Sequence, residues 1–222
     1  MYEVLAAAGF GLVLLIVLWP MKSTGKRLLK SWRVSDPTPG QIDDAVRYLK
    51  RRRLLYPVLF VGMSFVPFAS GRGLGSLAAI VLGGTLLAEL IAVALPREGR
   101  QRVASLAPRG LFDIGSRYVL GAYAAIVAIT LVWLVVNLQI SQLPVFVVSV
   151  AAVLAVWWAA VARPADGDEE VDRALRTRSV HVSAAIGAAM ACALVGGGFL
   201  FVGIAAWVLM ANTNTVSSKI VR

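Results

Sequence analysis

Long apolar runs alternate with polar segments along the chain. Six of these runs are close to or longer than the roughly 20 helical residues that cross a hydrocarbon core about 30 Å thick. They cover approximately residues 2–19, 54–70, 74–95, 118–137, 145–162 and 180–210. Each run is expected to be helical, because an open strand would leave backbone groups unpaired in lipid. The pattern therefore predicts an all-α polytopic membrane helix bundle with six transmembrane helices, in which residues 1–222 form a single transmembrane domain.

The basic residues lie almost entirely in alternate connections between these runs. Residues 20–53, 96–117 and 163–179 hold 19 of the 22 Lys and Arg residues, and the opposite side holds Arg72, Lys219 and Arg222. Basic loops face the cytoplasm in membrane proteins. We therefore expect these three segments to be cytoplasmic loops and both termini to be extracytoplasmic.

The composition supports the membrane class. The chain is 59% apolar and 15% charged, whereas soluble domains are roughly 45–50% apolar and about a quarter charged. Such hydrophobicity excludes a disordered protein. The single cysteine excludes a disulfide framework, and the single histidine excludes a metal or haem site built on histidine pairs, so we expect no cofactor.

The net charge of +10 would suggest nucleic-acid binding in a soluble protein. In a membrane protein it is better explained by cytoplasmic loops that face anionic lipid headgroups, and no nucleic-acid partner is expected. The excess of Arg over Lys, with abundant Ala, Val, Leu and Gly, is typical of GC-rich bacterial genomes. The expected location is therefore a bacterial cytoplasmic membrane.

The spans can be grouped as three hairpins, each passing through one basic loop. Two of the loops contain a similar pattern, Ile42–Arg47 and Val171–Arg176, in which an apolar residue and Asp precede Ala, an apolar residue and Arg. Internal repeats are common in membrane transport folds. The alternatives are an ancestral duplication and a chance match between frequent residue types.

Glu89 is the one ionisable residue well inside a predicted span. A carboxylate at this depth is costly and often serves as a proton relay or an ion ligand. The alternative is a structural role, in which Glu89 reaches the interface and pairs with Arg117 or Arg97. The sequence leaves both interpretations open.

The first loop is the largest polar segment. Its residues 26–34 mix cations with Leu and Trp, which suits a helix lying on anionic headgroups, and residues 41–53 read as a helix that runs into the second span. The alternative is a solvated loop that only enforces topology. The candidate lipid- or partner-binding residues are Lys26, Arg27, Lys30, Arg51, Arg52, Arg53, Arg117 and Arg178.

Two short runs carry a resemblance to a known group. The runs Arg102–Arg109 and Asp172–His181 resemble segments of uncharacterised actinobacterial multi-span membrane proteins. The resemblance covers about 20 residues in two loops. It implies a bacterial cell membrane and no particular activity.

Three functions fit these features. The first is an integral membrane subunit of a transport system, with basic loops that dock a cytoplasmic partner such as an ATPase. The second is a non-catalytic accessory or regulatory protein that binds anionic lipid, another membrane subunit or a second copy of itself. The third is an intramembrane enzyme acting on lipid through Glu89, Asp113, Arg117 and Arg178, which ranks last because no phosphate loop, nucleophile elbow or HExxH motif is present.

Overall fold

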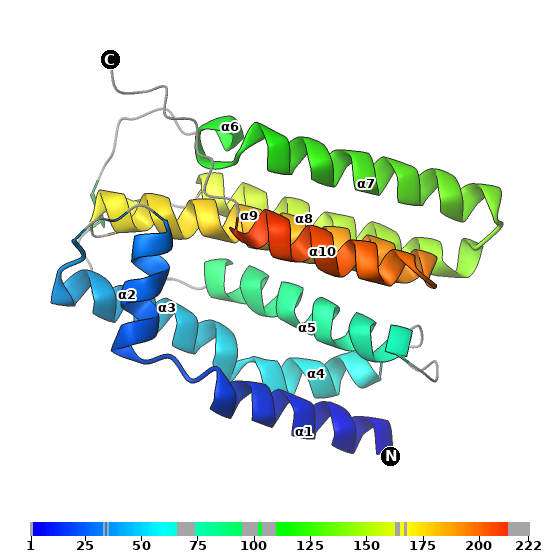
Figure 1. Ribbon diagram of the computed structural model, residues 1–222, viewed down its shortest axis with the longest axis horizontal. Helices are drawn as coiled ribbons and strands as arrows, with labels where there is room; N and C mark the ends of the chain where they lie inside the picture. The colour runs from blue at the N-terminus through cyan, green and yellow to red at the C-terminus, as the bar shows by residue number, and fades with distance from the viewer. Residues whose placement is uncertain are drawn as a thin grey trace.

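The fold is a bundle of helices that, apart from α2, run mostly along one direction (Figure 1). The computed structural model describes residues 2–32, 34, 36–65, 74–94, 102–103, 110–162, 165–166 and 168–212. The helices are α1 (Tyr2–Val17), α2 (Lys22–Ser31), α3 (Pro39–Leu54), α4 (Tyr56–Ser64), α5 (Leu74–Ala94), α6 (Leu111–Ile114), α7 (Arg117–Val136), η2 (Ile140–Gln142), α8 (Leu143–Ala162), α9 (Glu169–Val195) and α10 (Phe199–Asn212). Two-residue strands β1 (Arg102–Val103) and β2 (Ala165–Asp166) pair antiparallel. The predicted helical bundle is confirmed.

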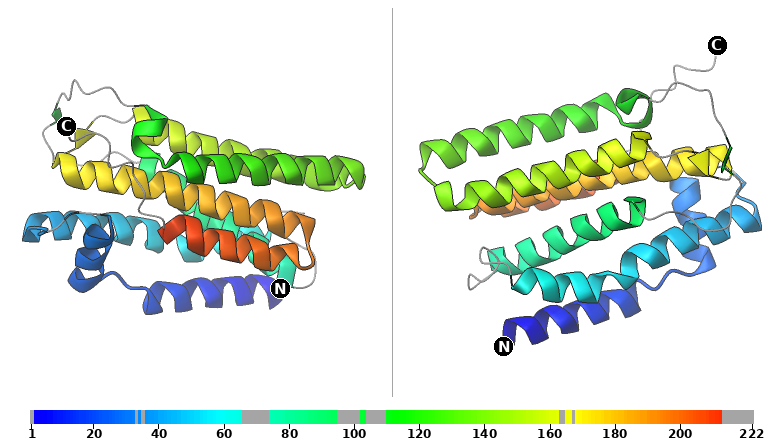
Figure 2. Two further views of the ribbon diagram at one scale, coloured as in Figure 1. Left: turned by 45° about the horizontal axis from the view of Figure 1, so that its top comes forward. Right: turned by 180° about the vertical axis from the view of Figure 1, so that it is seen from behind.

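Helix α9 lies at the centre of the bundle and packs against α5, α7, α8 and α10 (Figure 2). Its middle consists of small residues that allow close helix approach, and it is buried almost continuously from Val171 to Cys192. Helices α1, α4 and α5 lie on one side of α9 and α7 lies on the other, while α8 runs beside α9 and also packs on α5. The long α9 is therefore the element around which the other helices are arranged.

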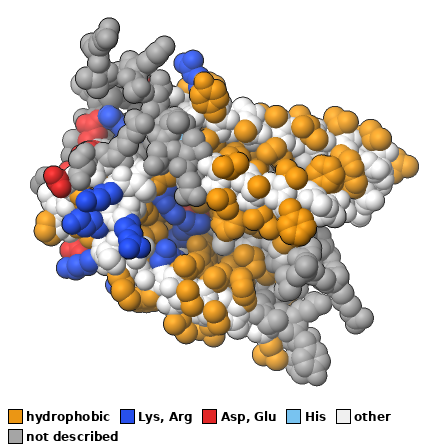
Figure 3. All heavy atoms as spheres, in the orientation of Figure 1, with side chains coloured by type: hydrophobic (Ala, Val, Ile, Leu, Met, Phe, Trp, Pro, Cys, Tyr) orange, Lys and Arg blue, Asp and Glu red, His pale blue; other side chains and the backbone are white. Residues whose placement is uncertain are grey.

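Three helices are long and apolar enough to cross a membrane, judged by length and composition of the described residues. They are Arg117–Val136, Ile140–Ala162 and Glu169–Val195. A fourth candidate span consists of residues Ala8–Val17 of α1 together with helix α2. The two helices are bent by 84° at the break between them. The apolar stretches Ala78–Ala94 and Phe199–Ala211 are shorter. Hydrophobic side chains cover much of the bundle along these helices, whereas charged side chains gather at the end formed by α2 and α3 (Figure 3).

The second predicted span, residues 54–70, contains the start of a new helix, α4, at Tyr56. The helix that leads into it, α3, starts at a capping box in which Thr38 and Gln41 each accept a hydrogen bond from the other's backbone. A break at Leu55 then separates α3 from α4, and Pro57 lies in the first turn of α4, where its missing N–H costs nothing. Pro57 therefore lies at a helix start and does not kink a continuous helix. Residues 66–70 of this span lie outside the described residues, as do the third-span residue 95, Arg72, Arg97, Lys219 and Arg222.

The last predicted span is wrong as a single helix over residues 180–210. Helix α9 begins at Glu169, capped by the Asp168 carboxylate, and ends before a turn of three glycines. Gly196 and Gly197 have φ values of +79° and +56°, a left-handed conformation that glycine adopts freely. The chain then reverses, and α10 packs back along α9 (Figures 1 and 2). The end of α10 consequently lies back toward the charged end of the bundle.

This reversal can be tested with the native Cys192 and a Gly203→Cys substitution. A Cβ at position 203 would lie 2.7 Å from the Cys192 Cβ, so a small shift of α10 lets the two sulfurs bond. In one continuous helix the same residues would be about 16 Å apart along the axis. We expect oxidation with copper phenanthroline to form an intramolecular disulfide, detected by mass spectrometry. The control is Ala205→Cys on the exposed face of α10, and equal bonding in both variants would contradict the reversal.

Helix α2 lies across the charged end of the bundle and packs on α3. The contact is close because Gly25 faces α3; a Cβ there would lie 2.8 Å from Val46 Cγ2 and 3.0 Å from the Ile42 carbonyl oxygen. Leu29 is buried in the same contact. The helix predicted in the first loop is therefore present, and its apolar face is covered by α3.

The two similar loop segments are both helical, in α3 and in α9. Ala45 and Ala174, which occupy matching positions, are buried in one hydrophobic cluster with Leu49 and Leu175. The first and third predicted hairpins correspond to helices that pack together, α1 with α4 and α8 with α9. The middle predicted hairpin, which corresponds to α5 and α7, differs from the other two. Helix α5 packs on α4, α8 and α9, while α7 packs on α9.

Candidate functional site

Glu89 is completely buried and has two partners on α3. Tyr48 donates its hydroxyl proton to Glu89 Oε1, and Arg52 Nε lies 2.9 Å from Glu89 Oε2. The contact between Arg52 and Glu89 is an ion pair, and its two atoms are not aligned as in a hydrogen bond. The side chain of Glu89 is 0% exposed and that of Arg52 is 8% exposed, so both charges are removed from water. A buried pair of this kind is costly to break from either side.

The predicted pairing of Glu89 with Arg117 is wrong. Arg117 is exposed at the start of α7, and Arg97 lies outside the described residues. The true partner is Arg52, because the last turns of α3 pack against α5. Arg52 was expected to bind lipid or a partner directly, and its first role is instead to neutralise Glu89.

Tyr48 connects this pair to α9. Arg178 Nη1 donates to the Tyr48 hydroxyl oxygen at 3.0 Å, and Ser179 Oγ lies 3.1 Å from the same oxygen. The Arg178 guanidinium also lies 5.5 Å from the centre of the Tyr48 ring, within the range of a cation–π contact. The hydroxyl of Tyr48 thus joins three helices, α3, α5 and α9, at one point.

Positive charge exceeds negative charge around Tyr48. We define the arginine cluster as Arg52, Arg53 and Arg178. Arg52 and Arg178 lie near the Glu89 carboxylate, and Arg53 is close enough to both of them for their charges to act on it. Burial lowers the pKa of Arg53, and the charges of Arg52 and Arg178 lower it further. Arg53 Nη1 is buried and has no hydrogen-bond partner among the described residues. The cluster therefore contains a donor and positive charge that Glu89 alone does not satisfy.

The pKa of Tyr48 should make stability depend on alkaline pH. Burial and then the negative charge of Glu89 raise this pKa from its ordinary 10.0 to about 12. Between those values the folded chain retains a proton that the unfolded chain releases, so stability falls as pH rises, by about 2–3 kcal/mol for a shift of this size. Denaturant unfolding in detergent at about pH 9 and about pH 12 measures the loss.

The Tyr48→Phe variant should lose this part of the pH dependence, because it has no hydroxyl to titrate. The Tyr118→Phe variant is the control, since Tyr118 is 81% exposed. If Tyr48→Phe became less stable between the two pH values by as much as the wild type, Tyr48 would not be the group responsible.

The remaining predicted cations occupy other places. Lys26, Arg27 and Lys30 are exposed on α2, and Arg51 is half-buried on α3. The structure therefore brings together three of the eight predicted cations, Arg52, Arg53 and Arg178, and leaves the α2 cations on a separate exposed face.

Of the residues proposed for an intramembrane enzyme, Arg178 lies near Glu89, whereas Asp113 and Arg117 are exposed on α6 and α7. Asp113 is exposed and caps α6 by accepting the Gly110 N–H at 2.9 Å. His181 is fully buried, and its Nε2 accepts the Ser116 backbone N–H at 3.0 Å, which joins α9 to the start of α7. No group of three or more His, Cys, Asp or Glu side chains able to hold a metal occurs in the described part of the chain.

Sequence reasoning missed Tyr48 and a second buried ion pair. Arg176 Nε lies 2.6 Å from Asp172 Oδ2, and Arg176 Nη1 donates to the Ala160 carbonyl at 2.7 Å, which connects α9 to α8. Both features had a signal in the sequence. Tyr48 and Arg52 are four residues apart, as are Asp172 and Arg176, which places each pair on one helix face.

Comparisons with known proteins add no relative. No family model, no curated protein and no solved structure matches the chain.

Proposed function

We propose that this protein is a non-catalytic accessory protein of a bacterial cytoplasmic membrane that binds the headgroup of an anionic phospholipid. The observation that supports it is the buried donor of Arg53, which has no hydrogen-bond partner among the described residues and lies where the charges of Arg52 and Arg178 also act. A planar guanidinium donates two parallel hydrogen bonds to a phosphate, and this is stronger than a neutral hydrogen bond. The phosphate would supply the negative charge that the arginine cluster lacks.

The proposed topology places the charged end of the bundle in the cytoplasm. The positive-inside distribution of Lys and Arg supports it, as does the position of α2 across that end. The six apolar runs would then each span or enter the membrane, with the N-terminus outside. Helix α10, with 14 residues, would return toward the cytoplasmic side.

A proton or ion pathway through Glu89 is disfavoured by its surroundings. Each carboxylate oxygen has a protein partner, and the side chain is fully buried between α3, α5 and α9. A relay would need access from water or a second titratable carboxylate. We therefore assign Glu89 a structural role in holding the arginine cluster.

A second candidate function is supported by α2. Its exposed cations Lys26, Arg27 and Lys30 face away from the buried contact of Gly25 and Leu29 on α3. Such a surface could dock an acidic cytoplasmic partner, including the ATPase of a transport system. Co-purification of that partner, lost on replacing these three cations with Gln, would favour this candidate.

Native mass spectrometry tests the lipid proposal. The purified protein is incubated in detergent with phosphatidylglycerol or phosphatidylcholine, and bound lipid is counted. We expect a preference for phosphatidylglycerol that falls about tenfold or more in Arg53→Gln, since hydrogen bonds to charged groups contribute about 1.5–3 kcal/mol. Arg47→Gln is the matched control, because Arg47 is exposed on the same helix. Equal binding by the two variants would overturn the proposal.

A further inference from the structure

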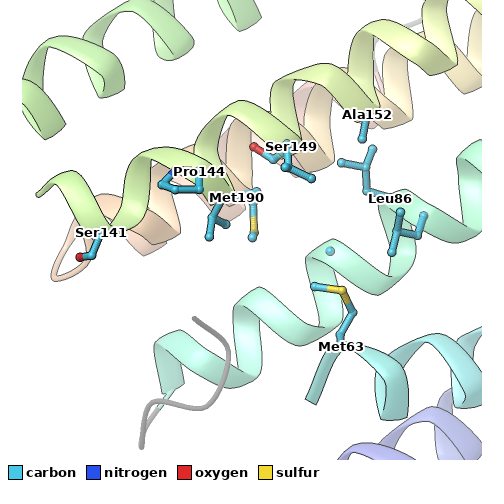
Figure 4. A pocket seen from close by; sticks show the side chains of 11 residues that line it. Met63, Leu86, Ser141, Pro144, Ser149, Ala152 and Met190 are labelled. Atoms are coloured by element: carbon cyan, nitrogen blue, oxygen red, sulfur yellow. The ribbon is translucent and has the colours of Figure 1, made fainter. Parts of the chain in front are cut away.

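A cavity of about 510 Å³ lies between the two sides of the bundle, away from the arginine cluster. Helices α4 and α5 form one wall and α8 forms the other (Figure 4). Met63 and Leu86 face Pro144 and Ala152 across it, and Met190 of α9 closes the back. The cavity is therefore lined by α4, α5, α8 and α9, with Ser141 from η2, and it belongs to none of the contacts that hold Glu89.

The chemistry of the lining is almost entirely hydrocarbon. Among the described residues that line the cavity, only Ser141 and Ser149 have polar side chains, and Ser149 already donates to the Phe146 carbonyl at 2.8 Å. A water molecule needs two to four polar partners to be stable in a cavity. An apolar ligand would restore the dispersion contacts that an empty space loses. The cavity thus suits a flexible hydrocarbon chain and does not suit an ion or a polar solute.

The cavity is continuous with the apolar exterior of the bundle. Val148 lines it and is 66% exposed, and the neighbouring Val147 is 59% exposed. Both residues lie within the candidate membrane span Ile140–Ala162. At this depth the surrounding medium is the acyl chains of the bilayer. The occupant can therefore enter sideways from the membrane.

We propose that the cavity binds one acyl chain of a membrane phospholipid. The end of the cavity near Ser141 and Pro144 lies at the connection between α7 and α8, at the end of the bundle away from α2 and α3. In the topology proposed above, this acyl chain belongs to a lipid of the outer leaflet. This site is distinct from the headgroup site, and it recognises the chain without recognising the charge of the lipid.

The test uses a zwitterionic lipid, so that it does not depend on the arginine cluster. The full chain is reconstituted in phosphatidylcholine nanodiscs that contain a small fraction of phosphatidylcholine with a photoreactive acyl chain, and cross-linked peptides are mapped by mass spectrometry. We expect cross-links on the segments around residues 83–87 and 144–152. Cross-links confined to exposed positions of the bundle, with none on the segment around residues 83–87, would overturn the proposal.

A matched pair of substitutions on α8 completes the test. Ala152→Phe places a ring in the cavity, and Ala151→Phe places the same ring on the exposed face one residue away. Cross-linking at residues 83–87 should fall about tenfold in Ala152→Phe and stay unchanged in Ala151→Phe. Thermal unfolding checks that both variants fold, and Ala152→Leu replaces Ala152→Phe if the larger ring prevents folding. Equal cross-linking in the cavity-filling and control variants would show that the cavity holds no lipid chain.

Discussion

Glu89→Gln is expected to destabilise the protein by about 3–5 kcal/mol, because it leaves a buried charge without its counter-ion. The side chain of Arg52 is 8% exposed and cannot reach water without disturbing the packing of α3 on α5. Arg178 lies close by and adds to the uncompensated positive charge. Thermal or denaturant unfolding in detergent measures the loss.

An exposed ion pair gives the control for this prediction. Glu169 and Arg173 lie 2.8 Å apart on the surface of α9, and both side chains are 65% exposed. Glu169→Gln should change stability by about 0–1 kcal/mol. The double variant Glu89→Leu with Arg52→Met should recover much of the loss, since it removes both buried charges. A Glu89→Gln variant as stable as Glu169→Gln would refute the buried ion pair.

Gly187→Leu should have the second-largest effect, a loss of about 1–3 kcal/mol or more from overpacking. Gly187 is buried at the centre of α9. A Cβ there would lie 2.5 Å from Val153 Cγ2 and 2.9 Å from Tyr123 Cε2. Val153 is fully buried and β-branched, so it has little freedom to move away. The substitution should therefore push α9 away from α7 and α8.

Gly121→Leu on α7 is the matched control, because a Cβ at Gly121 would meet nothing within 4 Å. It should leave stability unchanged or raise it by a few tenths of a kcal/mol through better helix propensity. Melting temperatures of the two variants in one detergent make the comparison. If Gly187→Leu had the same melting temperature as Gly121→Leu, this result would contradict the central position of α9 in the bundle.

Hydropathy predicted the helical class and much of the helix placement, but not the chain reversal. The predicted limits of α7 differ from the observed ones by one residue at each end, and α5 begins at the predicted residue 74. The run from 180 to 210 stays apolar through the turn, so a hydropathy pattern has no reason to divide it. The three consecutive glycines were the available signal, since Gly196 and Gly197 adopt positive φ.

The functional site was only partly visible in the sequence. Glu89 stood out because a carboxylate is rare in an apolar run, and this required no knowledge of packing. Its partner depended on which helix packs beside α5, and that contact joins residues 37 positions apart in the chain, at 52 and 89. Tyr48 carries no charge, so its place between Glu89 and Arg178 was not apparent from the charge pattern.

The buried network and the proposed lipid site are two aspects of one arrangement. Glu89 fixes Arg52 and Tyr48, Tyr48 receives Arg178, and Arg53 follows Arg52 in the chain. The carboxylate thereby holds several cations close together at the charged end of the bundle. A rigid group of this kind loses little side-chain entropy when it binds a phosphate.

The most direct test of the proposed function is a crystal structure grown from a lipid mesophase that contains phosphatidylglycerol. The account predicts a lipid phosphate within hydrogen-bond distance of Arg53 Nη1 and next to the Arg178 guanidinium. Density showing Arg53 Nη1 bound only to protein or water, with phosphatidylglycerol absent from the arginine cluster, would contradict it.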